Sequence, residues 1–146
     1  MIMRKCTILK SQKMTATNRE QSQRLLACGV DPETADMVWT IWDNDGERYE
    51  QLSIMDESAY EMACLNPIPA WSLGALLTKV LPNVFEDGNY RHVLTIQYVH
   101  GATEDRVWDM RYEDILTGMF IHDIDAPHPI EACVRMVEKL KEKGRI

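Results

Sequence analysis

The chain has 146 residues, of which 45% are hydrophobic and 27% are charged, and its formal net charge is −7. These values are typical of a globular domain with a sizeable core and exclude wholesale disorder. No apolar run approaches the roughly 20 residues that span a bilayer, and the first residues lack the apolar segment of a secretory signal. We therefore expect a cytoplasmic protein that makes no membrane contact.

Residues 1–13 are predicted to be a basic, poorly ordered tail, because they contain four basic residues, no acidic residue and no helical or strand pattern. The sequence leaves open whether Met1 or Met14 is the natural start. Residues 14–146 form the predicted single domain, which contains 12 basic residues and all 23 acidic residues. Such a surface repels nucleic acid, which is disfavoured as a partner.

The first predicted helix covers residues 20–28 and is capped by Asn18 or Thr17. Gly29 follows it at the position that favours a left-handed backbone. Asp31 then caps a second, short helix that has a proline at its first position.

This helix pair, residues 18–37, permits a second interpretation as a DNA-binding regulator. The second helix is short, however, and it offers Glu33 and Asp36 where a DNA reader would place basic or amide side chains. We therefore rank this function below the others.

Residues 37–42 and 49–54 are rich in aromatic and β-branched side chains and predict a hairpin. The connecting run, residues 43–46, superficially resembles a calcium loop. Its glycine comes too early and no glutamate stands at the twelfth place, so turn chemistry explains it better.

The centre of the chain is predicted to organise the fold. A short helix at residues 56–65 and a stiff, extended, proline-rich connector precede Trp71. With Ser72 as N-cap, Trp71 and Leu76 have the spacing of a hydrophobic staple, and Pro82 ends the helix after two to three turns. We expect Trp71 in the core, with the alternative that it is a binding residue that contacts a ligand or partner.

After a predicted polar loop at residues 83–89, two further strands form the clearest hairpin in the sequence. Apolar and aromatic side chains alternate with polar ones in both strands, so one face needs a covering helix. The apolar positions are Leu94, Ile96, Tyr98, Trp108, Met110 and Tyr112.

The covering helix is predicted to begin at Pro129 and to end at Gly144. Its apolar face consists of Ile130, Cys133, Val134, Val137 and Leu140. The sequence thus predicts a single α+β domain, in which a small antiparallel sheet of about four strands packs against the central and C-terminal helices.

The cysteines, Cys6, Cys28, Cys64 and Cys133, form no pair with the spacing of a zinc or redox motif. Cys28 and Cys133 lie in predicted helices and are interpreted as buried, reduced thiols. We also find no phosphate-binding loop and no nucleophile motif.

The segment before the last helix holds the best candidates for chemistry. His122, Asp123, Asp125 and His128 lie within seven residues, and carboxylate and imidazole are ligands of hydrolytic zinc or manganese sites. A metal-dependent hydrolase is therefore one alternative function. An ordinary loop with the same residues is the competing interpretation, and we favour it, with no cofactor.

Three stretches carry a resemblance. They are Leu-Leu-x-Cys-Gly-Val-Asp-Pro-x-Thr-Ala-Asp-Met, Ile-Pro-Ala-Trp-Ser-Leu-Gly-x-Leu-Leu and Glu-Ala-Cys-Val-x-Met with a final Lys-Gly-Arg-Ile. Over residues 18–146 the chain resembles small uncharacterised proteins of phages, prophages and mobile elements of gut bacteria. This resemblance implies a genomic setting and no catalytic or binding residue.

We therefore expect a non-enzymatic accessory protein of a phage or mobile element that acts through protein-protein contacts. Its partner would be a host or phage protein, and its acidic surface could imitate the charge of nucleic acid. The sequence leaves homo-oligomerisation open.

Overall fold

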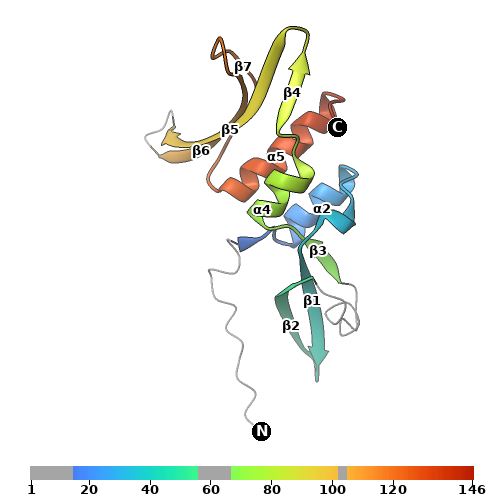
Figure 1. The fold of residues 1–146 in the computed structure, drawn as a ribbon. Helices are drawn as coiled ribbons and strands as arrows, with labels where there is room; N and C mark the ends of the chain where they lie inside the picture. Colours follow the sequence, from blue (N-terminus) through green and yellow to red (C-terminus); the bar gives the residue numbers. More distant parts are fainter. Residues whose placement is uncertain (1–14, 56–66, 102–104) are drawn as a thin grey trace.

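Helix α5 (Pro129–Glu142) is the centre of the fold in the computed structural model, where it contacts the four-stranded sheet as well as helices α2 and α4 (Figure 1). The structure describes residues 15–55, 67–101 and 105–146, so the predicted tail and the predicted helix at 56–65 lie outside it. Within these ranges the fold class is α+β, as predicted. No helix in the described ranges is long and apolar enough to cross a bilayer.

The predicted apolar face of α5 is confirmed. Pro129 occupies the first turn, and Gly144 has a φ of 67° just beyond the last turn. Every predicted contact residue is buried, namely Ile130, Cys133, Val134, Val137 and Leu140. Burying five such side chains supplies most of the stability of this helix, because helices of this length are marginal in water without packing.

The four-stranded antiparallel sheet has the order β4-β5-β6-β7. Its middle strands, β5 (Tyr90–His100) and β6 (Arg106–Asp114), form the predicted hairpin. The predicted apolar positions lie directly opposite one another, in the pairs Leu94–Tyr112, Ile96–Met110 and Tyr98–Trp108. Met110 and Tyr112 belong to the main core together with α5.

Two strands of this sheet contradict the sequence-based expectation. Strand β4 (Val84–Asp87) forms where a polar loop was expected, and β7 (Phe120–Ala126) forms where a loop was favoured. Both are edge strands that pair with one neighbour only. Acidic residues in both segments favoured a loop in the sequence-based prediction. The strands form nevertheless, because strand formation depends on pairing with a neighbouring strand more than on local sequence.

Helix α2 (Arg19–Ala27) is confirmed, and Asn18 forms a capping box with Gln21 at its start. Gly29 has a φ of 84° at its end. The second predicted helix is only the single 3₁₀ turn η1 (Pro32–Thr34). A turn of this length cannot lie along a major groove as a recognition helix does.

An ion-pair network joins α2 to α5. Arg24 donates to Glu131 at 2.9 Å and also pairs with Glu138, while Gln21 donates to Glu131 at 2.6 Å. Burial acts to raise the pKa of Glu131, but the bonds from Gln21 and Arg24 outweigh it and hold that pKa below its ordinary value. The network fixes how α2 lies on α5.

The central segment begins as predicted and then departs from an ordinary α-helix. Ser72 caps the single turn α4 (Leu73–Ala75), and η2 (Leu76–Val80) continues it as a π-helical turn. The amide of Leu81 donates to the carbonyl of Leu76 at 2.8 Å and closes this turn. Pro82 follows directly, as the predicted stop.

A second sheet, of order β2-β1-β3, extends from the other end of the molecule (Figure 1). Strands β1 (Met37–Asn44) and β2 (Glu47–Ile54) are the predicted hairpin, with positive φ at Asp45 and Gly46 in the turn. The proline-rich connector was expected to be extended, with no prediction of a strand. Its residues Ile68–Ala70 instead form β3, which pairs with β1.

Candidate functional site

The predicted metal-ligating residues lie in different surroundings. His122, Asp123 and Asp125 lie on β7, whereas His128 is exposed at the N-cap of α5. The ring of His122 lies against Phe85, with 6.3 Å between the ring centroids. In the described part of the chain, no three His, Cys, Asp or Glu side chains are grouped as a metal site requires.

Asp125 instead lies directly opposite Asp109 of β6. Desolvation and the neighbouring Asp109 carboxylate raise the pKa of Asp125. Asp109 is buried, and it accepts hydrogen bonds from Gln97 at 2.8 Å and from Nε of Arg111 at 2.7 Å. Arg111 compensates the charge of Asp109. The two neighbouring carboxyl groups, Asp109 and Asp125, therefore need no metal ion to explain them.

Trp71 is fully buried and ties distant parts of the chain together. Its indole N–H donates to Oγ1 of Thr34 at 2.9 Å, and its main-chain N–H donates to Oγ1 of Thr17 at 3.0 Å. The amide of Thr17 donates back to the carbonyl of Trp71 at 2.9 Å. The predicted core position is confirmed, and a side chain enclosed in this way has no surface to offer a partner.

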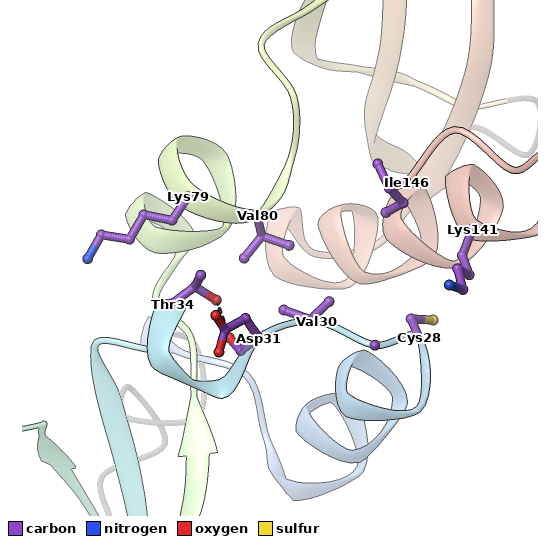
Figure 2. A pocket seen from close by; sticks show the side chains of 9 residues that line it. Cys28, Val30, Asp31, Thr34, Lys79, Val80, Lys141 and Ile146 are labelled. Carbon is purple, nitrogen blue, oxygen red and sulfur yellow. Dashed lines mark hydrogen bonds between the residues drawn. The ribbon is translucent and has the colours of Figure 1, made fainter.

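A pocket of about 240 Å³ lies where α2, η2 and α5 end (Figure 2). Val30 and Val80 face each other across it, and Lys79 and Lys141 lie on opposite sides. Both lysines belong to the last turns of their helices, where a cation complements the helix dipole. Because the helix ends account for the lysines, the charge around the pocket does not specify a ligand. Its volume is also below the roughly 300–1,000 Å³ of typical ligand pockets.

The cysteines of the described residues are unreactive in this fold. Burial raises the pKa of Cys133 to about 12. Burial, with a contribution from the charge of Glu138, also raises the pKa of Cys28, which lies at the pocket. Cys133 is buried as predicted, whereas Cys28 is only partly buried, and neither thiol has the lowered pKa of an activated nucleophile.

The most unusual surface feature is the connection between β6 and β7. Together with the first residue of β7, it presents four large apolar side chains to solvent: Ile115 is 64% exposed, Leu116 87%, Met119 67% and Phe120 48%. We call residues 115–120 the tip. A group of exposed apolar side chains in neighbouring positions is typical of an interaction site, whereas single ones are common on any surface.

The backbone of the tip is held by Asp114, which is only 2% exposed. Its carboxylate accepts from the amide and the hydroxyl of Thr117, at 2.9 and 2.7 Å, and from the amide of Arg91 at 3.2 Å. Its own amide donates to the carbonyl of Met119 at 2.7 Å, and Gly118 makes the turn with a φ of 70°. The hydrogen bonds of Thr117 lower the pKa of Asp114, so the carboxylate stays charged and the turn stays fixed.

Sequence reasoning missed the tip. The run from Asp114 to Phe120 does hold a signal, because Thr117 and Gly118 mark a turn while apolar residues stand on both sides of it. Apolar residues beside a turn are more often the ends of buried strands, and only the fold shows that these four are exposed.

Comparisons with protein-family models, with curated proteins and with solved structures find no match for this chain.

Proposed function

We propose that this chain is a cytoplasmic accessory protein of a phage or mobile element and that it binds a partner protein through the tip. The observation that carries this proposal is the exposure of Ile115, Leu116, Met119 and Phe120 on one short turn. The resemblance of three sequence stretches to phage and prophage proteins supports the genomic setting.

The fixed backbone of the tip favours binding. A loop that is already ordered loses little conformational entropy when a partner immobilises it, so more of the apolar contact energy appears as affinity. The hydrogen bonds of Asp114 order this loop and leave its four apolar side chains exposed. The arrangement therefore combines an apolar contact surface with a rigid support.

The shape and charge of the chain define the partner. A projecting turn fits a concave surface, so we infer an apolar groove on a globular protein. The net charge of −7 favours a groove with a basic rim and opposes both an anionic bilayer and a second copy of the same acidic chain.

Site-specific photo-crosslinking in the host cytoplasm tests this proposal. A photoreactive residue at position 116 should capture one defined protein, and the same residue at position 54 should not. Ile54 is a matched control because it is 74% exposed but lies on β2, in the other sheet.

Three outcomes would contradict the proposal. They are equal capture from positions 116 and 54, crosslinking of position 116 to a second copy, and flotation of the protein with vesicles that is lost in Leu116→Asp. The first would show that the tip is no specific contact. The others would identify an oligomer interface or a membrane anchor instead.

A further inference from the structure

His122 has an unusual backbone for a histidine within a strand. Its φ is 53°, in the left-handed region that side chains other than glycine rarely adopt. The register between β6 and β7 shifts between Met110 and Tyr112, so His122 and Asp123 together lie opposite Arg111. This is a bulge, and bulges redirect side chains.

The redirected side chain of His122 is partly buried, and one of its ring nitrogens is enclosed without a hydrogen-bond partner. Its ring packs edge-on against Phe85, which itself packs against Tyr112 at 4.6 Å between centroids. Its Nε2 atom is buried and unpartnered in the structure. Burying an unpartnered nitrogen costs some free energy when the imidazole is neutral, and it costs much more when the ring is charged.

The groups around His122 also oppose a positive charge. Burial is the main cause that lowers its pKa, followed by Arg145, Lys139 and Lys143 at the end of α5 and by His92 on β5. Two acids on other strands of this sheet have partners of their own. On β4, Asp87 pairs with Arg145 at 3.8 Å, and on β6, Asp114 holds the tip.

We propose that His122 is a pH-sensitive latch, which holds the start of β7 and the adjoining tip in place while its ring is neutral and releases them when the ring is protonated. The imidazolium gains by moving into water, which also relieves the left-handed backbone. Phe120 and Ile121 then lose their pairing with β6, and the bond from Asp114 to Met119 is lost with them.

The direction of the pH effect follows from the protons that each state binds. Because the pKa of His122 is lower in the latched state than in the released state, the released state binds more protons. The latch is therefore stable above the ordinary histidine pKa of about 6.5 and weakens as the pH falls below it. Opening should increase by up to roughly tenfold for each pH unit between that value and the lowered one.

Hydrogen exchange of the chain by itself tests the latch without any partner. After correction for intrinsic exchange, the amides of residues 119–123 should lose protection several-fold between pH 7.5 and 5.5. In His122→Asn, which tolerates the left-handed backbone but does not titrate, protection should not depend on pH. The same pH dependence in His122→Asn would overturn the proposal.

A second variant keeps the test decisive if His122→Asn is poorly folded. Lys143→Gln with Arg145→Gln removes two exposed cations, so acid should open β7 less than in the wild type. His128→Asn is the matched control, because His128 is exposed at the N-cap of α5, and it should behave like the wild type. An unchanged response in the double variant, or a lost response in the control, would overturn the latch.

The effect of the latch on partner binding rests on the proposed function. Affinity for the crosslinked partner should fall several-fold more between pH 7.5 and 5.5 in the wild type than in His122→Asn. If exchange shows the latch but affinity ignores it, the tip is not the contact surface, and the proposed function fails while the latch remains.

Discussion

Replacement of Trp71 by alanine tests whether the central segment organises the fold. The side chain is fully buried, and truncation of a buried tryptophan typically costs about 3–5 kcal/mol. The lost hydrogen bond from its indole N–H to Thr34 contributes roughly 0.5–1.5 kcal/mol of that. The main-chain bonds to Thr17 remain possible with alanine, so the loss belongs to the side chain. At about 2–4 °C per kcal/mol for a chain of this size, Tm should fall by roughly 6–20 °C.

Urea unfolding followed by circular dichroism measures this loss directly. Trp71→Phe, which keeps a buried ring but lacks the N–H donor, should lose less than half as much as Trp71→Ala. Ile54→Ala, at an exposed site, should change the free energy of unfolding by less than about 0.5 kcal/mol. A loss below about 1 kcal/mol in Trp71→Ala would refute the reasoning, because an organising core residue cannot be dispensable.

Three further substitutions have defined outcomes. Asp125→Asn should stabilise the protein at pH 7: a carboxyl whose pKa is raised in the fold contributes stability at low pH and loses it as the pH rises through that value. The gain should therefore vanish below about pH 4 in unfolding curves across pH, and a constant gain would contradict the influence of Asp109. Arg24→Met should cost about 1–2 kcal/mol, because the half-buried Glu131 then keeps only the exposed Arg135 as its cation, and Glu131→Gln should reduce that loss in a double-mutant cycle. Gly118→Ala should cost about 1 kcal/mol or more in urea unfolding because of its φ of 70°. Steric overlap adds nothing to this cost, because an added Cβ would lie 3.8 Å from the nearest atom. An unchanged midpoint would show that the turn is not fixed.

The elements that local patterns determine were predictable. The i, i+3, i+4 spacing of α5 and the alternation in β5 and β6 each encode a buried face within one segment. Caps are equally local, so Ser72 and Gly29 were assigned their positions from sequence, and Asn18 was one of two candidates for its cap. These signals predicted the α+β class and the covering helix.

The elements that depend on a partner strand were not predictable. Strand β7 contains a bulge at His122 that breaks its alternation, and β4 is four residues long with acids at its end. The tip escaped prediction for a related reason. Exposure of Leu116 follows from where β6 ends in the sheet, which the sequence of the turn does not encode.

The most direct test of the central claim is the affinity of the purified crosslinked partner for two matched variants, measured by titration calorimetry at pH 7.5. Leu116→Asp and Ile54→Asp add the same charge to exposed apolar sites, one beside the four-stranded sheet and one on the three-stranded sheet. Loss of a buried leucine contact of about 1.5–3 kcal/mol predicts at least tenfold weaker binding by Leu116→Asp, with Ile54→Asp unchanged. Equal affinities for both variants and the wild type would contradict the account.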